Sequence, residues 1–155
     1  MRGFRLRFGR GVLTMAMGLS MLTACATSRP PAITFLTPYG PPVNPFSPAV
    51  QVGSMLYLAG QIGTDSTGKL VAGGMAPEAH QTMRNIADVL AKTGSSMDRV
   101  VKCTVFLADM KEWPAFNTIY ASYFPGSKPA RSALGANGLA LGARVEVECW
   151  AVVTK

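Results

Sequence analysis

A strand predicted over Arg99–Ala108 carries apolar side chains on both of its faces, and this pattern most constrains the fold. Side chains alternate between the two faces of a strand. One face therefore receives Val101, Cys103, Val105 and Leu107, and the other receives Val100, Thr104 and Phe106. A sheet built on this strand has to be covered on both sides, because each side exposes apolar surface.

Two helices are predicted, one before this strand in the sequence and one after it. The first spans Pro77–Thr93, has a proline in its first turn, stops before Gly94 and carries an apolar stripe of Ala79, Met83, Ile86 and Leu90. The second is marked by four aromatic residues on one side of a helix, which we interpret as packing residues: Trp113, Phe116, Tyr120 and Tyr123.

The remaining elements are strands. Val50–Gly53 and Met55–Gln61 form a hairpin, Asp65–Gly68 is a turn, and two later strands begin at Arg131 and span Val145–Val153. The order β-β-α-β-α-β-β predicts an α+β fold in which a mixed sheet has both helices on one face. Since the other face stays open, the chain is predicted to form an oligomer.

Residues 1–24 are predicted to be an export signal. Met1–Arg10 holds four arginines and no acid, Gly11–Leu22 is uncharged and mostly apolar, and small residues precede Cys25. The ending Leu-Thr-Ala-Cys resembles a bacterial lipobox, in which the cysteine is diacylated and becomes the first mature residue, so Cys25 is the predicted lipidation site. Because Ala26 is not the aspartate that signals inner-membrane retention, the resemblance implies an outer-membrane lipoprotein facing the periplasm. A plain signal peptide cleaved near Ala26, or a misassigned start codon, is the alternative.

Composition after the signal indicates a tether and one domain. Seven of the eleven prolines lie between residues 28 and 48, and residues 25–44 are interpreted as an extended tether. Residues 45–155 then form one domain of about 110 residues. Without residues 1–24 the net charge falls from +7 to +3, and the basic residues are scattered, which gives no indication of nucleic-acid binding. With one histidine and no Walker, GxGxxG, HExxH or CxxC motif, neither a metal nor a cofactor is predicted.

Arg131 is the candidate functional residue with the clearest signal. No other charged residue lies between Pro129 and Ala143, and a guanidinium among small apolar residues needs a carboxylate or an anionic ligand as its partner. Its planar fork of donors suits a carboxylate. Glu146 and Glu148 follow closely. An arginine facing a glutamate indicates either a site for a small carboxylate-bearing substrate or an ordinary buried ion pair.

Several ordered segments of the domain are similar to the RidA (YjgF/YER057c/UK114) family of small trimeric proteins. These segments are AGQIG (59–63), TGKLV (67–71), VVKCTVFLADM (100–110), FNTIYASYF (116–124), PARSALG (129–135) and RVEVECWAVV (144–153). The resemblance covers about residues 45–155. It implies a chorismate-mutase-like fold and a homotrimer with sites in clefts between subunits. It also implies hydrolysis of 2-imino and 2-enamino acids to 2-keto acids and ammonia, without metal or cofactor.

The resemblance also implies roles for particular residues. Arg131 matches the family's carboxylate-binding arginine and Glu146 the acid that positions the attacking water, so both are candidate catalytic residues. Asn117 and Gly60 match substrate-binding positions of the family. A clamped carboxylate would orient the C=N carbon while Glu146 relays protons between water and the leaving amine.

Three substrate-binding positions depart from the family pattern. Phe46 stands where a tyrosine is usual, Ala59 where a serine is usual, and Ala133 where a cysteine is usual. Each exchange removes a hydroxyl or a thiol and makes the site more apolar. We therefore expect activity to persist, with a preference for larger apolar imines.

Four further residues receive structural interpretations. His80 is expected to be a surface histidine on the polar side of the first helix. Glu148 is expected to be a structural ion-pair partner. Cys103 and Cys149 are expected to be buried free thiols, because their spacing shows no disulfide framework, although export would allow them to oxidise.

Two functions stay open at this point. The chain is either an exported, lipid-anchored imine deaminase or a non-catalytic binding or protective lipoprotein on the same trimeric scaffold. Export favours the second, because such imines arise mainly from cytoplasmic enzymes that use pyridoxal phosphate, and so do the three lost polar groups. A ribonuclease role gains no support, since the domain lacks a histidine-based acid–base pair and a basic stripe.

Overall fold

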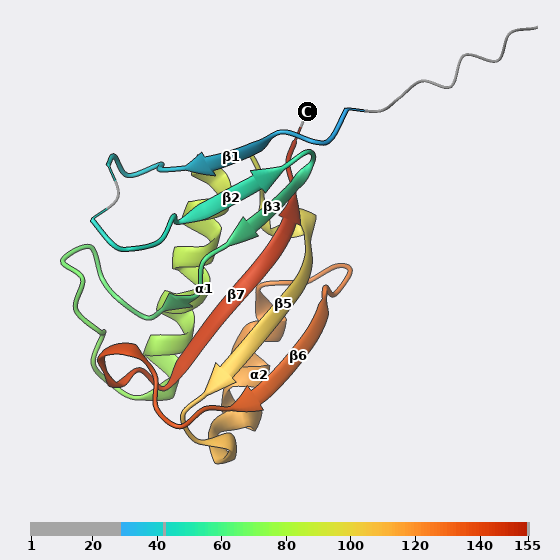
Figure 1. The fold of residues 1–155 in the computed structure, drawn as a ribbon. Helices are drawn as coiled ribbons and strands as arrows, with labels where there is room; N and C mark the ends of the chain where they lie inside the picture. Colours follow the sequence, from blue (N-terminus) through green and yellow to red (C-terminus); the bar gives the residue numbers. More distant parts are fainter. Residues whose placement is uncertain (1–28, 42, 155) are drawn as a thin grey trace, which may run out of the picture.

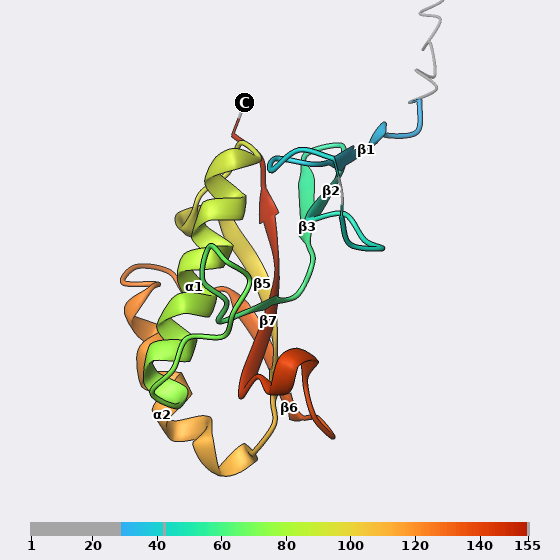
Figure 2. The same ribbon diagram turned by 90° about the vertical axis from the view of Figure 1, so that its left-hand side faces the viewer.

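The computed structural model describes residues 29–41 and 43–154. A mixed β-sheet forms one layer and two helices form a second layer on one face of the sheet (Figure 1, Figure 2). No helix in these residues is long and apolar enough to cross a membrane. The predicted export signal and the lipidation site Cys25 lie outside the described residues.

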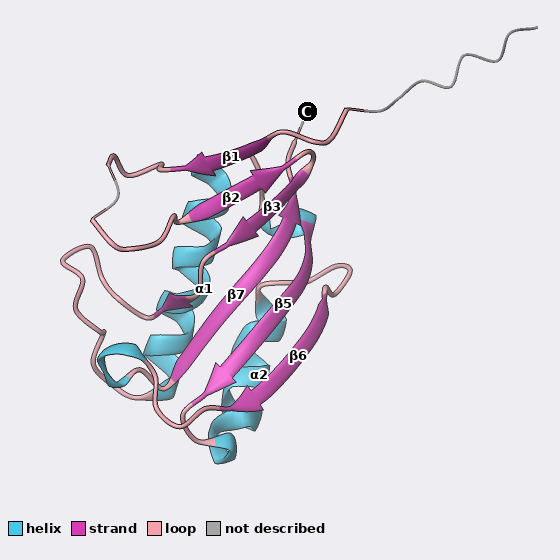
Figure 3. Cartoon of the chain, viewed as in Figure 1, coloured by secondary structure: helices cyan, strands magenta, loops and turns pink. Residues whose placement is uncertain are grey.

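The sheet has the strand order β1-β2-β3-β7-β5-β6, and β4 pairs with β7 beyond the end of β3. Its strands are β1 (Ile33–Leu36), β2 (Ala49–Val52), β3 (Met55–Leu58), β4 (Gln61–Ile62), β5 (Val100–Leu107), β6 (Ala130–Gly135) and β7 (Val145–Val152). β5 and β6 run parallel, and the other pairs are antiparallel (Figure 3). The helices are α1 (Met75–Lys92) and α2 (Trp113–Ser122), and the predicted α+β fold is confirmed.

The sheet begins inside the segment that was interpreted as a tether. Ile33–Leu36 form β1, which pairs antiparallel with β2, and Leu36 packs against the core. The sheet therefore begins at β1, upstream of residue 45. Four residues between prolines are too short a run to be recognised as a strand from their alternation alone.

The first helix follows its predicted pattern. Ala79, Met83, Ile86 and Leu90 are fully buried against the sheet. Gly94, just after the helix, has φ 79°, a left-handed conformation that glycine adopts readily. The N–H of Ser95 then donates to the carbonyl of Leu90 at 2.9 Å, which satisfies a carbonyl at the end of the helix.

α1 also makes a contact that the sequence did not indicate. His80 is half-buried, and its Nδ1 lies 3.1 Å from the hydroxyl of Tyr123 at the end of α2. The expectation of a surface histidine is therefore wrong, because the packing of the two helices supplies a partner that is distant in sequence.

A β-bulge at the start of β5 changes which of its side chains face the helices. The register between β5 and β7 shifts between Val100 and Lys102. As a result Val100 is buried beneath the helices, whereas Val101 is 42% exposed. Strict alternation predicts Val101 on the same face as Cys103, and this prediction is wrong because a bulge adds one residue to the strand.

The face of the sheet opposite the helices is uncovered in the single chain (Figure 2). Phe35, Val50, Tyr57 and Trp150 occupy paired positions on four neighbouring strands and form an apolar row across this face. The rings of Tyr57 and Trp150 meet edge to face, with centroids 5.1 Å apart. This is the apolar open face from which the oligomer is predicted.

A disulfide joins Cys103 on β5 to Cys149 on β7. The two residues are directly opposite each other in the antiparallel ladder, and both are fully buried. The expectation of two free thiols is wrong. The cysteines are 46 positions apart in the sequence, and the pairing of β5 with β7 that brings them together is a tertiary contact that cysteine spacing does not reveal.

Candidate functional site

Arg131 is held against α2 by three side chains of that helix. Its Nη2 donates a hydrogen bond of 2.7 Å to Oδ1 of Asn117. The guanidinium carbon lies 4.6 Å from the ring centroid of Trp113 and 4.5 Å from that of Tyr120. These contacts are attractive and restrict the orientation of the guanidinium. Neither Nε nor Nη1 has a hydrogen-bond partner in the described chain, so both are free to meet an anion.

Helical periodicity explains how α2 surrounds the arginine. Trp113, Asn117 and Tyr120 are four and three residues apart, which places them on one side of the helix. The aromatic residues of α2 do pack against the core, as expected, but two of them also contact Arg131. Burial raises the pKa of Tyr120 to about 12 although the charge of Arg131 opposes this, so the phenol stays neutral beside the cation.

Glu146 lies on the open face of β7, next to Gly60. Ile62 of β4 is paired with Glu146, and a Cβ atom at residue 60 would overlap Oε1 of the carboxylate. Only a glycine therefore fits at residue 60 while Glu146 keeps this position. The backbone at Gly60 and the carboxylate form one continuous surface, which agrees with the prediction that both residues belong to the site.

The environment of Glu146 favours its protonated form. Burial raises the pKa of its carboxyl group, and the nearby carboxylate of Glu148 raises it further. A carboxyl group with a raised pKa is suited to exchange protons near neutral pH. The described residues form no ion pair with Glu148, so the expected structural ion pair is not formed within one chain. The carboxylate of Glu148 instead raises the pKa of Glu146.

Gly60 and Phe46 line a cavity of about 510 Å³. Its other walls come from the segment before β2, from β4 and the turn after it, from α1, and from the loop before β7: Tyr39, Asn44, Pro48, Gln61, Ile62, Thr64, Gly68, Val89, Ala140 and Leu141. Ala59 lies directly before Gly60, and its N–H donates to the carbonyl of Pro48 at 3.0 Å. The volume is within the range of small-molecule sites.

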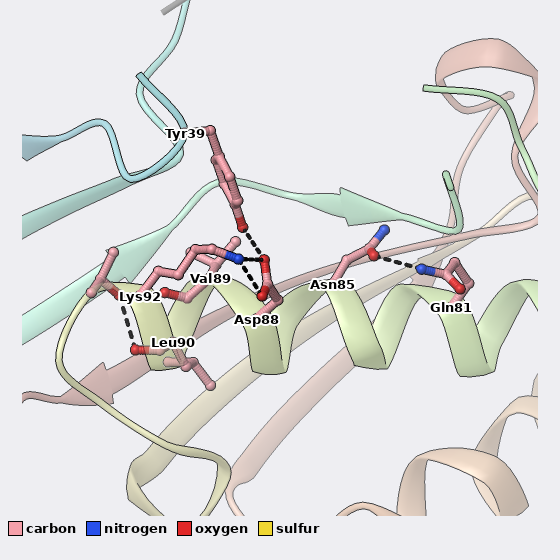
Figure 4. Close-up of polar contacts among 8 residues, drawn as sticks. Tyr39, Gln81, Asn85, Asp88, Val89, Leu90 and Lys92 are labelled. Atoms are coloured by element: carbon pink, nitrogen blue, oxygen red, sulfur yellow. Dashed lines mark hydrogen bonds and ion pairs between the residues drawn. The ribbon is translucent and has the colours of Figure 1, made fainter. Parts of the chain in front are cut away.

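Two contacts with α1 hold the walls of this cavity in place, and the one between Tyr39 and Asp88 is drawn in Figure 4. The hydroxyl of Tyr39 donates to Oδ2 of Asp88 at 2.8 Å, and the ammonium of Lys92 donates to the same oxygen at 2.6 Å. Partial burial, followed by the contact with Asp88, raises the pKa of Tyr39 to about 12, so the hydroxyl keeps its proton. Asn85 donates to the carbonyls of Ile62 and Thr64, both at 2.9 Å, and fixes β4 against the helix.

The candidate residues form two groups on different parts of the sheet. Arg131 pairs with Cys103 on β5, whereas Glu146 pairs with Phe106, three residues farther along the same strand. That offset corresponds to about 10 Å along the strands, and the intervening strand adds about 10 Å across them. An odd offset also puts the two side chains on opposite faces. Arg131 and Glu146 do not face each other within one chain.

The other predicted positions divide in the same way. Asn117 and Ala133 lie with Arg131 at the β6 edge, where Ala133 is half-buried against the core. Phe46, Ala59 and Gly60 lie with Glu146, on the side of the sheet where β4 pairs with β7.

Comparisons with known proteins identify the family. The family model for endoribonuclease L-PSP matches residues 38–153. A mouse protein named 2-iminobutanoate/2-iminopropanoate deaminase is 46% identical over 111 residues, which cover 71% of this chain and 82% of the mouse protein. This chain belongs to the RidA/YjgF family. The resemblance read from the sequence motifs is confirmed.

Solved structures of the RidA/YjgF family agree with the fold. YyfA of the Rid protein family from Yersinia pestis is 36% identical with a TM-score of 0.73, covering 79% of this chain and 100% of YyfA. TdcF from Escherichia coli, solved with bound serine, is 26% identical with a TM-score of 0.69, covering 77% of this chain and 98% of TdcF. This RidA-family chain therefore has the architecture that the motifs implied.

Sequence reasoning missed Glu78, which stabilises the start of β7. This carboxylate is buried on α1 and accepts hydrogen bonds from the backbone N–H groups of Arg144 at 2.6 Å and Val145 at 3.3 Å. These residues directly precede Glu146. An acid in the first turn of an amphipathic helix is ordinary, so nothing in the sequence singled it out.

Proposed function

We propose that this RidA-family chain hydrolyses 2-imino and 2-enamino acids to 2-keto acids and ammonia. The fixed guanidinium of Arg131 carries this proposal. Three side chains of α2 orient it, and Nε and Nη1 remain free for an incoming carboxylate. The mouse relative named as a deaminase and the serine bound to TdcF support a small, amino-acid-like substrate.

In this reaction Arg131 binds and orients the substrate, and Glu146 transfers protons. Arg131 binds the carboxylate and thereby positions C2 of the imine. Water adds to C2 of the protonated imine while Glu146 accepts one proton from the water. Glu146 then gives this proton to the nitrogen. The C2–N bond breaks and ammonia leaves, while Glu146 takes the hydroxyl proton as the C2–O bond becomes the carbonyl of the keto acid. Glu146 finally passes this proton to the departing ammonia, which leaves as ammonium, and is again a carboxylate. The raised pKa of Glu146 supports both halves of this exchange.

A complete site requires two copies of the chain, and we propose a homotrimer. Arg131 and Glu146 lie on opposite faces of the sheet, two strands apart. A second copy that places its β6 edge beside the Gly60–Glu146 surface of the first would bring both groups to one substrate. The apolar open face of the sheet supports such an assembly, because it needs cover.

A direct assay tests the activity. 2-Aminoacrylate is generated in situ from serine by a dehydratase, and the formation of pyruvate is followed with and without the purified protein. We expect faster pyruvate formation with the wild type and the spontaneous rate with Arg131→Ala. Arg84→Ala, on the exposed side of α1, is the matched control and keeps full activity. Equal rates for the wild type and Arg131→Ala would rule out the deaminase.

We also propose export and lipidation at Cys25, with an outer-membrane location. The basic, apolar and small-residue order of residues 1–25 supports export, and so does the Cys103–Cys149 disulfide, because structural disulfides persist in oxidising compartments. A fatty-acid probe should label the wild-type protein in bacterial cells but not Cys25→Ser. Equal labelling of the two proteins would overturn lipidation.

A binding or protective lipoprotein on the same scaffold is the second candidate. It is favoured by Phe46, Ala59 and Ala133, which supply no hydroxyl or thiol to the site. This candidate predicts that 2-keto acids bind at Arg131 while imine hydrolysis stays at its spontaneous rate. Calorimetric titration of a keto acid alongside the rate assay distinguishes the two.

A further inference from the structure

Two large apolar side chains are exposed at the cavity beside Gly60. Phe46 is 53% exposed and Leu141 is 70% exposed, and both line this cavity. Single apolar residues scattered over a surface are common. Two that converge on a hollow next to a candidate catalytic carboxylate instead provide apolar binding surface.

Leu141 also has an unfavourable backbone conformation. Its φ of 57° and ψ of 12° are left-handed, and it is the only non-glycine residue with positive φ in the described chain. Glycine or asparagine adopts this conformation more readily than leucine. A left-handed backbone raises the free energy of a leucine. Because Leu141 is exposed in the single chain, burial of its side chain does not compensate for this. Such a residue in a site wall indicates that its side chain has a role there.

The rest of the wall is uncharged. No Asp, Glu, Lys or Arg side chain lines the cavity, and Pro48, Ile62 and Ala140 extend its apolar surface. The charged pair Asp88 and Lys92 anchors Tyr39 from α1 but does not line the cavity. A charged group placed inside would lose hydration without gaining a partner of opposite charge, whereas an apolar group would gain contact with the apolar walls.

We infer that this cavity receives the side chain of the substrate, and that Leu141 selects 2-imino acids with large apolar side chains over alanine-derived 2-iminopropanoate. This inference rests on the proposed function. Arg131 of a second copy holds the carboxylate, C2 lies against Glu146 and Gly60, and the side chain extends past Gly60 toward Leu141 and Phe46. Branched aliphatic and aromatic side chains fill the cavity, and acidic ones are rejected.

Competing substrates test the selection. The full chain is assayed with imines generated in situ by an amino-acid oxidase from alanine, leucine, phenylalanine and glutamate. We expect kcat/KM for the leucine-derived imine to exceed that for the alanine-derived imine about tenfold. Leu141→Asn keeps a residue that tolerates the left-handed backbone and removes the apolar surface, so this ratio should fall about fivefold or more.

A control and a binding measurement separate the outcomes. Ile33→Asn removes an exposed apolar side chain of β1 outside the cavity and should leave the substrate ratio unchanged. Calorimetry should show 4-methyl-2-oxopentanoate binding more tightly than pyruvate to the wild type, with the difference reduced in Leu141→Asn. A wild-type ratio near one, or an unchanged ratio in Leu141→Asn, overturns the selection while the deaminase stands. If no imine reacts faster than with Arg131→Ala, the proposed function and this inference both fail.

Discussion

Asn117 on α2 accepts a 2.7 Å hydrogen bond from Nη2 of Arg131 on β6. One nitrogen of the guanidinium is thereby occupied, and Nε and Nη1 remain without a partner in the described chain. The relationship couples the helix layer to the edge strand of the sheet. It makes the arginine a preorganised anion site in an isolated chain, before any second copy is present.

Removal of this hydrogen bond should weaken substrate binding. We expect Asn117→Ala to raise KM about tenfold, since a hydrogen bond to a charged group contributes about 1.5–3 kcal/mol, with a smaller effect on kcat. Asn117→Asp should be worse, because its carboxylate competes with the substrate for Arg131. Steady-state kinetics on the alanine-derived imine measures both, and an unchanged KM in both variants would contradict the role of Asn117.

The ring of Trp113 should contribute to the same clamp. We expect Trp113→Ala to raise KM about fivefold, in line with a partly desolvated cation–π contact of about 1 kcal/mol. Trp113→Phe keeps an aromatic face and should recover most of this loss. Tyr123→Phe, at the residue that follows α2, is the matched control, because Tyr123 contacts His80 and not Arg131. A similar KM for Trp113→Ala and the wild type would show that the ring only packs.

The pH dependence of the reaction should report the raised pKa of Glu146. Burial, followed by the charge of Glu148, shifts this pKa upward. Because the carboxylate form accepts the proton of water, kcat/KM should rise with pH through a pKa above that of an ordinary glutamate. Glu148→Gln removes one cause of the shift and should move the rising limb to lower pH. Glu146→Gln should abolish this limb, and a limb that survives in Glu146→Gln belongs to another group.

Glu78 should act as a positioning residue for the start of β7. Glu78→Ala leaves the buried N–H groups of Arg144 and Val145 without their acceptor, so the free energy of unfolding should fall by about 2–4 kcal/mol. Glu78→Gln keeps an acceptor oxygen and should restore most of the stability and of kcat. Urea unfolding and steady-state kinetics measure the two effects. If the Glu78→Gln and Glu78→Ala variants lose the same amount of stability and activity, the charge at this position matters and the hydrogen bonding does not.

The Cys103–Cys149 disulfide should contribute strongly to stability. The bond closes a loop between residues 46 positions apart, for which the chain-entropy model gives about 4 kcal/mol. We therefore expect urea unfolding at a lower midpoint when dithiothreitol is present. The Cys103→Ala, Cys149→Ala double variant should unfold near the reduced midpoint and be insensitive to dithiothreitol. A wild-type midpoint that does not respond to reduction, once thiol titration shows complete reduction, would contradict this contribution.

The main helices and strands could be predicted from the sequence, because the residue patterns that identify them are short and local. The stripe from Ala79 to Leu90 identified α1, the Gly53 turn identified the hairpin of β2 and β3, and motif spacing identified the family. β1 was not predicted, because its four residues are a short run between prolines. The face of Val101 was predicted wrongly because the bulge in β5 depends on the register with β7.

For the site, residue type and motif predicted the chemistry of the residues but not their arrangement. Arg131, Asn117, Gly60 and Glu146 were named from residue type and motif, since a guanidinium or a carboxylate carries its reactivity wherever it lies. The fold was needed to show that Arg131 and Glu146 lie on opposite faces, that Cys103 is bonded to Cys149, and that Leu141 lines a cavity. The reason is register: one residue of shift between paired strands turns every side chain to the other face, and pairing between distant strands is not encoded in any local period.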